Sequence, residues 1–177
     1  AYYNRGNSKG NLKDYYGAIS DYTRAIEINP NDARAYYNRG ITKYDLKDYY
    51  GAISDYTRAI ELDPNKVNAY YNRGLSKDYL KDYYGAIADY TKAIEINPNY
   101  ADAYYNRGLS KYNLKDYNGS IADYTKAIEI NPNYASAYTN RSISKYSLGD
   151  KNGACQDARK TQDLGADASE LIKIVCK

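Results

Sequence analysis

One block of text recurs along this chain every 34 residues, and this period constrains the fold more than any other feature. The fullest copy spans residues 101–134, and nearly the same text occupies 67–100 and 33–66. A cropped copy occupies 1–32, and a degraded copy occupies 135–166. A fixed period of this length is typical of arrays in which each unit packs mainly on its neighbours. The chain is therefore expected to fold as five units and a tail.

Within a unit, apolar residues follow helical spacing twice. Over residues 103–115, one face carries residues at i, i+4 and i+7: Tyr105, Leu109 and Tyr112. Asp116 is well placed to cap a second helix over 118–130, since its carboxylate can accept from free N–H groups of the first turn. The four prolines of the chain all end the second helix of their unit: Pro30, Pro64, Pro98 and Pro132. Each unit is therefore predicted to be a helix–turn–helix.

Composition argues against several classes of function. The 25 basic and 22 acidic residues give a net charge of only +3, whereas nucleic-acid binding needs a strongly basic stripe. No run of 18 apolar residues predicts a membrane span. Two cysteines and no histidine cannot complete a zinc site, and the usual catalytic nucleophile and acid–base sets are missing. We therefore expect no metal, no cofactor and no enzymatic activity.

The aromatic composition is unusual, with 26 tyrosines and no phenylalanine or tryptophan. The tyrosines stand at places set by the repeat. A recoded, designed or inferred sequence would explain this, and so would a natural bias; the composition leaves both open.

The conserved places within each unit resemble the tetratricopeptide repeat family, and the resemblance extends to about Ala168. The family pattern has an aromatic residue, a small residue four later, and a small, an aromatic and an alanine residue before a closing proline. The fourth unit carries these as Tyr104, Gly108, Ser120, Tyr124, Ala127 and Pro132. Small residues let antiparallel helices approach, and aromatic rings fill the adjacent space. The resemblance implies an all-α solenoid, a right-handed superhelix of helical hairpins with repeats at 1–32, 33–66, 67–100, 101–134 and 135–166.

The fifth repeat departs from this pattern. Ser142 replaces the glycine and Ala158 the aromatic residue, and residues 167–177 resemble a helix that caps the array. Cys155 and Cys176 are equally distant from the turn that precedes this helix. They could form a disulfide worth about 3 kcal/mol in a loop of roughly 20 residues, which would indicate an extracellular or periplasmic protein. The alternative is two small buried residues in a cytoplasmic protein.

Three further rows repeat in every unit. An arginine of the first helix and an aspartate of the second predict an internal ion-pair ladder. A lysine four residues after each arginine could join it. A functional anion site is the less favoured alternative. The pairs are Arg5/Asp21, Arg39/Asp55, Arg73/Asp89, Arg107/Asp123 and Arg141/Asp157. A glycine also opens each second helix, for which we favour copying of a founding repeat over close packing: Gly17, Gly51, Gly85, Gly119 and Gly153.

An asparagine row marks the candidate binding surface. In this family the first helices line a concave groove, and asparagine can both donate to and accept from a peptide backbone. A similar ladder is thought to grip peptides in the O-linked N-acetylglucosamine transferase. The predicted groove residues are Asn4, Asn38, Asn72, Asn106, Asn140, Tyr3, Tyr37, Tyr71, Tyr105, Ile41, Leu75, Leu109, Tyr44 and Tyr112. A purely structural role between repeats is the alternative. The family's carboxylate clamp is not expected, because its basic members are absent.

The predicted function is a non-enzymatic scaffold that holds a peptide or protein segment in this groove. The first alternative is self-assembly, in which near-identical repeats of separate copies stack into oligomers or filaments. The second is a fragment of a larger enzyme or regulator. Two short sequons, at Asn118 and Asn140, are weak candidates for glycosylation.

Overall fold

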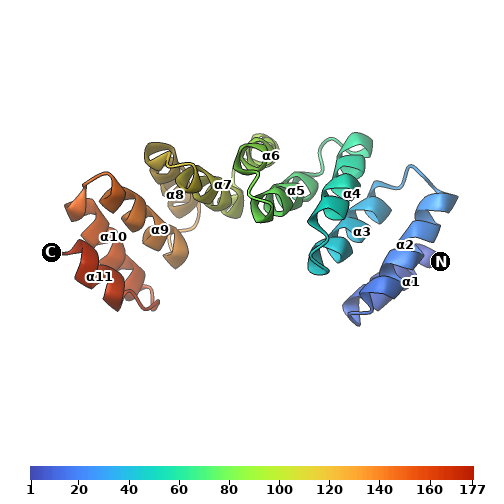
Figure 1. The fold of residues 1–177 in the computed structure, drawn as a ribbon, viewed down its shortest axis with the longest axis horizontal. Helices are drawn as coiled ribbons and strands as arrows, with labels where there is room; N and C mark the ends of the chain where they lie inside the picture. The colour runs from blue at the N-terminus through green and yellow to red at the C-terminus, as the bar shows by residue number, and fades with distance from the viewer. The chain divides into compact units, whose positions relative to one another are not determined.

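The computed structural model describes all residues, 1–177, and they form eleven α-helices and no strand (Figure 1). The predicted all-α solenoid fold is therefore confirmed. The helices are α1 Tyr2–Asn11, α2 Tyr15–Ile28, α3 Ala33–Asp45, α4 Tyr49–Leu62, α5 Val67–Tyr79, α6 Tyr83–Ile96, α7 Ala101–Asn113, α8 Tyr117–Ile130, α9 Ala135–Ser147, α10 Lys151–Asp163 and α11 Ser169–Val175. Two compact units contain them, Ala1–Ile96 with α1 to α6 and Asn97–Lys177 with α7 to α11.

The turn inside each hairpin is tighter than the sequence predicted. Helix α7 ends at Asn113, so Leu114 and Lys115 belong to the turn rather than to the helix. Lys115 adopts a left-handed backbone with φ of 63°. The Lys115 N–H then donates to Tyr112 O at 2.8 Å, and the Asp116 N–H donates to Lys111 O at 2.9 Å. These bonds satisfy the last carbonyls of α7. The same turn recurs with positive φ at Lys13, Lys47, Lys81 and Gly149.

Each second helix begins at an aspartate cap. Asp116 Oδ1 accepts from the Gly119 N–H at 2.9 Å, as predicted, and the other repeats repeat this bond. A Cβ added to Gly119 would collide with the Asp116 carboxylate. The glycine therefore gives the capping carboxylate room, and copying of a founding repeat as the origin of this row stays a prediction.

A glycine and a tyrosine hold the two helices of each hairpin together. A Cβ on Gly40 would lie 2.7 Å from Cε1 of Tyr56, whose side chain is 1% exposed. Burial of this ring raises the pKa of Tyr56. In the fifth repeat the pair becomes Ser142 and Ala158, and Ser142 Oγ donates to Ala154 O at 2.7 Å. Where alanine replaces the tyrosine ring in the fifth repeat, the facing helix thus carries serine instead of glycine.

The predicted ion pairs form in every repeat. In the second repeat, Arg39 donates to both carboxylate oxygens of Asp55, at 2.9 and 2.7 Å, and Lys43 Nζ lies 2.7 Å from the same carboxylate. Arg39 also donates to Thr23 of the preceding repeat at 2.9 Å. The guanidinium therefore ties a hairpin together and binds it to its neighbour. In the first repeat, hydrogen bonds from Arg5 hold the pKa of Asp21 well below its usual range.

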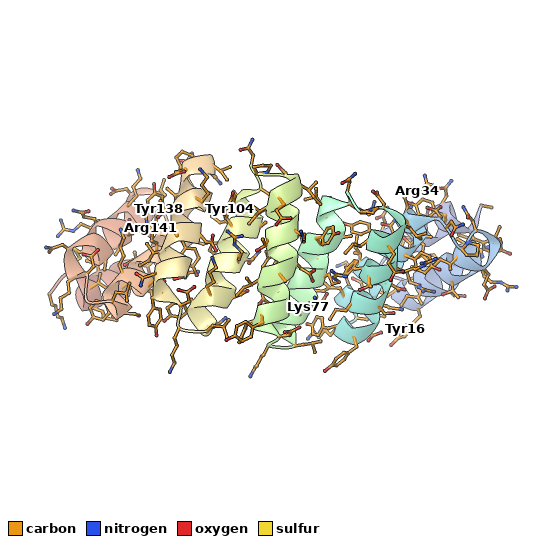
Figure 2. All side chains as sticks on the ribbon, turned by 90° about the horizontal axis from the view of Figure 1, so that it is seen from above. Tyr16, Arg34, Lys77, Tyr104, Tyr138 and Arg141 are labelled. Atoms are coloured by element: carbon orange, nitrogen blue, oxygen red, sulfur yellow. A yellow bond between two sulfur atoms is a disulfide. The ribbon has the colours of Figure 1, made fainter.

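An aromatic ring covers the same arginine. The Arg141 guanidinium carbon lies 5.4 Å from the ring centroid of Tyr138, and Figure 2 labels both residues. This cation–π contact and the ion pair with the aspartate both stabilise the charged guanidinium within the repeat. The arrangement supports the ion-pair interpretation of the row, since Arg39, Arg73 and Arg141 each have a carboxylate, a hydroxyl and an aromatic partner.

Helix α11 packs on α10, where a disulfide joins Cys155 to Cys176 with 4.9 Å between their Cα atoms. Val175 of α11 is buried against Ala154 and Ala158. A cross-link over this sequence separation of 21 contributes about 3 kcal/mol on the chain-entropy estimate. None of the eleven helices is long and apolar enough to cross a membrane.

Candidate functional site

The first helix of each hairpin lies on the inner side of its compact unit. Helix α3 contacts both α1 and α5 in the first unit, and α7 contacts α9 in the second. Successive second helices make no comparable contacts. The predicted groove residues all belong to the first helices, so they lie on the side where these helices follow one another.

The asparagine and tyrosine rows form hydrogen bonds between repeats. Asn38 Nδ2 donates to the hydroxyl of Tyr3 at 3.0 Å, and Asn72 Nδ2 donates to that of Tyr37 at 3.1 Å. In the second unit Asn140 Nδ2 donates to the Tyr105 hydroxyl at 2.9 Å. Two rows that the sequence presents separately are thus one set of bonds between successive repeats.

These bonds leave the carbonyl oxygen of each amide available. The side chains of Asn38, Asn72 and Asn140 are half-buried, and their carbonyl oxygens accept no hydrogen bond from the protein. Asn72 and Asn140 each donate one bond across the repeat boundary, whereas Asn38 Nδ2 donates there to both Tyr3 and Asn7. A fixed amide with a free acceptor can bind a backbone N–H of a ligand. Asn4 is exposed.

The apolar groove residues are only partly accessible. Ile41, Leu75 and Leu109 are half-buried. Tyr44 packs edge-on against Tyr49 and Tyr79, at centroid distances of 5.5 and 5.6 Å. Tyr49 and Tyr79 stack on each other at 4.7 Å. Tyr112 likewise packs on Tyr117, at 5.4 Å. Tyr44 and Tyr112 are therefore packed against neighbouring rings rather than free to contact a ligand with their whole ring.

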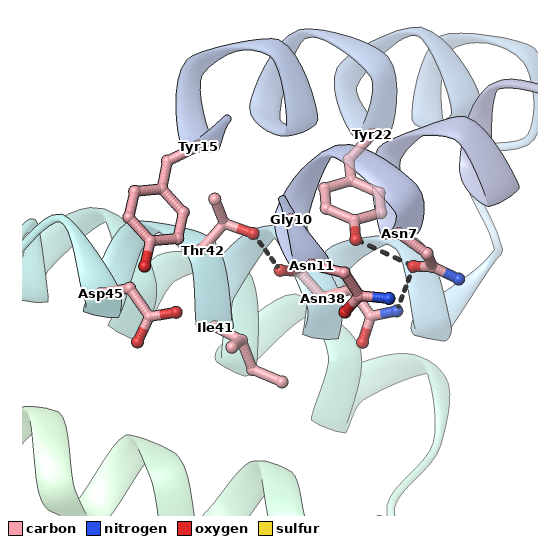
Figure 3. A pocket seen from close by; sticks show the side chains of 9 residues that line it. All are labelled: Asn7, Gly10, Asn11, Tyr15, Tyr22, Asn38, Ile41, Thr42 and Asp45. Atoms are coloured by element: carbon pink, nitrogen blue, oxygen red, sulfur yellow. Dashed lines mark hydrogen bonds between the residues drawn. The ribbon is translucent and has the colours of Figure 1, made fainter. Parts of the chain in front are cut away.

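A pocket of 420 Å³ opens between α1, α2 and α3 in the first unit (Figure 3). Its volume lies within the range of ligand pockets. Only Asn38 and Ile41 of its lining were predicted as groove residues. The complete lining is Asn7, Gly10, Asn11, Tyr15, Tyr22, Asn38, Ile41, Thr42 and Asp45.

A polar network forms one wall of this pocket. Tyr22 is buried, which raises its pKa to about 12, and its hydroxyl donates to Asn7 Oδ1 at 2.8 Å. Asn38 Nδ2 donates to the same oxygen at 3.0 Å. Figure 3 shows these three side chains converging, with Tyr15 and Asp45 at the opposite end of the pocket.

Sequence reasoning missed Asn7, Gly10 and Asp45. The available signal was their departure from the repeat, because the corresponding places in the fourth repeat hold Leu109, Tyr112 and Asn113. Such departures in near-identical copies mark places where one repeat differs in surface chemistry.

The two sequons lie in different environments. Asn118 is exposed at the second residue of α8. Asn140 lies in the middle of α9, half-buried, with its amide bonded to Tyr105. Of the two, only Asn118 presents an unobstructed side chain.

Comparisons with known proteins agree on one family. The family model described as "Tetratricopeptide repeat" matches residues 1–32, 33–66, 67–100 and 101–134. The crystal structure of MamA superposes with a TM-score of 0.88 at 28% identity, covering 90% of this chain and 94% of MamA. No curated protein sequence matches the chain significantly.

Two further solved structures are more distant in sequence and show the fold alone. MamA from Desulfovibrio magneticus RS-1, from residue 41 to its end, gives a TM-score of 0.88 at 22% identity, covering 93% of each chain. YrrB, described as a TPR protein with an unusual peptide-binding site, gives 0.85 at 21% identity, covering 97% of this chain and 88% of YrrB.

Proposed function

We propose a function for this chain from its family: it belongs to the tetratricopeptide repeat family, and we infer that it is a non-enzymatic scaffold for a peptide or protein segment. The segment would lie in an extended conformation along the first helices. Its backbone N–H groups would donate to the carbonyl oxygens of Asn38, Asn72 and Asn140.

The observation that carries this proposal is the fixed orientation of the amides. The Tyr37 hydroxyl accepts from Asn72 at 3.1 Å, so the amide loses little freedom when a ligand binds. Recognition of a backbone does not depend on ligand side chains, which suits a row of identical residues. The description of YrrB as a peptide-binding TPR protein is consistent with this use of the fold.

Head-to-tail self-assembly is less well supported. Another copy could stack on the last repeat only if the outer face of α10 were open. Helix α11 covers this face, and the disulfide holds α11 there. Arg159 also stands where the earlier repeats have the threonine that accepts from the next arginine. The first repeat of another copy would therefore find no open face there, and its arginine would find no threonine hydroxyl.

Replacement of Asn72 tests the proposal. Peptides selected from a random library against the intact chain supply the ligand. Asn72→Ala should weaken the binding of the selected peptides about tenfold, because a fixed amide contributes about 1 kcal/mol or more per backbone hydrogen bond. Calorimetry measures the affinity, and circular dichroism should show unchanged helicity.

Two controls separate binding from structure. Tyr37→Phe removes the bond between repeats but keeps the Asn72 amide, so it should lower stability by about 1 kcal/mol and affect binding less. Asn68→Ala alters an exposed asparagine of the same helix and should change neither. Failure to select any peptide would refute the proposal. Loss of helicity in Asn72→Ala would assign the row to structure.

A further inference from the structure

The pocket of the first two repeats has a counterpart in the fourth and fifth. That second pocket measures only 80 Å³, against 420 Å³. Three of its residues match the first pocket by type: Tyr22 with Tyr124, Asn38 with Asn140, and Ile41 with Ile143. The other two differ, because Leu109 and Tyr112 stand in place of Asn7 and Gly10. Loss of these two large side chains accounts for the larger pocket.

The same exchange changes the chemistry of the pocket. In the fourth repeat the Tyr124 hydroxyl is buried without a hydrogen-bond partner beside Leu109. In the first repeat Asn7 satisfies the equivalent hydroxyl of Tyr22 at 2.8 Å. An apolar crevice has thus become a roomy pocket whose polar wall is already hydrogen-bonded. Such a wall needs no rearrangement when a ligand enters.

The charge of the pocket is negative. Its lining includes the Asp45 carboxylate and no lysine or arginine. Asp45 is exposed and forms no ion pair, and Lys47, two residues later, is exposed without pairing to it. By contrast, the aspartates of the second helices are buried and each is paired with an arginine and a lysine. Asp45 is therefore available to an external cation.

Two helix ends add to this charge. Asn11 is the last residue of α1 and Asp45 the last residue of α3, so both carboxyl-terminal ends adjoin the pocket. Helix C-termini carry partial negative charge, which disfavours a carboxylate there and favours a cation. The other repeats carry neutral residues at the place of Asp45: Asn11, Tyr79, Asn113 and Ser147. Among the first helices, only α3 ends on a carboxylate, and that carboxylate lines the pocket, which points to a cationic ligand.

We propose that this pocket binds the cationic side chain, lysine or arginine, of the segment held by the first helices. The aliphatic stem would pack on Ile41 and Tyr15, and the charged head would meet Asp45 and the ends of α1 and α3. This inference rests on the proposed function and adds a side-chain preference to it.

The probe is the set of peptides selected from a random library against the intact chain. The selected peptides should share a lysine or arginine at one position. Its replacement by glutamine should weaken binding to the unaltered protein about fivefold, as expected for an accessible charge pair. With Asp45→Asn the same replacement should change affinity little. The difference should also shrink in high salt.

Two variants sharpen the test. Asp163→Asn removes an equally exposed carboxylate from the end of α10 and should preserve the preference. The pair Asn7→Leu and Gly10→Tyr copies the fourth repeat and should abolish it by filling the pocket. A Cβ on Gly10 would lie 3.8 Å from the Tyr22 hydroxyl, an ordinary contact, so this change is compatible with folding.

The outcomes separate the two proposals. Selected peptides without a shared basic residue, or a preference unchanged by Asp45→Asn, would overturn the cationic pocket while leaving the scaffold function intact. If no peptide is selected, the scaffold function fails and the pocket proposal fails with it.

Discussion

Asp89→Ala is expected to lower the free energy of unfolding by about 3 kcal/mol, the lower end of the range for removal of one partner from a buried ion pair. Asp89 is 3% exposed and accepts from Arg73 at 3.0 and 2.6 Å, with Lys77 at 2.7 Å. Its removal leaves two cations with side-chain exposures of 17% and 20% facing each other. The lower end applies because Arg73 keeps its bond to Thr57 and both cations keep some water.

The first repeat provides a matched control. Asp21 is as buried as Asp89, but its partners Arg5 and Lys9 have side-chain exposures of 59% and 32%. Water can solvate these cations once the carboxylate is gone, so Asp21→Ala should cost clearly less. Because repeat arrays can unfold in parts, the urea unfolding experiment should be combined with a measurement of amide hydrogen exchange in α5 and α6. Equal losses for the two variants would contradict the role assigned to the stranded cations.

Gly40 and Tyr56 are expected to be strongly coupled. Gly40→Ser alone should destabilise the protein by about 1–3 kcal/mol, because its Cβ would overlap a buried ring. Tyr56→Ala alone should cost about 3–5 kcal/mol through the cavity it leaves. The double variant should lose less than the sum by about 1 kcal/mol or more.

The fifth repeat supplies the reason for this coupling. There Ser142 and Ala158 already coexist, and the serine hydroxyl donates to Ala154 O. In the double variant the introduced serine would have room and an equivalent acceptor at Ala52 O. Thermal or urea unfolding of the four proteins completes the cycle. Strict additivity would show that the two side chains do not compensate each other.

The hairpins and their packing could be predicted from the sequence because the relevant signals are steric. Gly108 and Tyr124 identify a close approach of two helices, and the ring indeed occupies the space beside the glycine. The arginine and aspartate rows were paired correctly because a partly buried charge requires an opposite one. These arguments depend on residue type alone.

Other features depended on information that residue type does not carry. Lysine has no preference for left-handed backbone, so nothing marked Lys115 as the turn residue. The asparagine row could bind a peptide or join repeats, and the structure gives Asn72 a bond between repeats together with a free acceptor. The pocket beside Asn7 and Gly10 was missed because repetition drew attention to shared residues, whereas the pocket arises from exceptions.

The left-handed turns lower the stability of the array below what the same fold could reach. Glycine occupies this turn only in the fifth repeat, at Gly149, and lysine occupies it in the other four. A side chain in this backbone region costs about 1 kcal/mol, offset in part by a cation beside the negative pole of the preceding helix. Each exchange of one of these lysines for glycine would therefore raise the melting temperature, and the four exchanges together would raise it most.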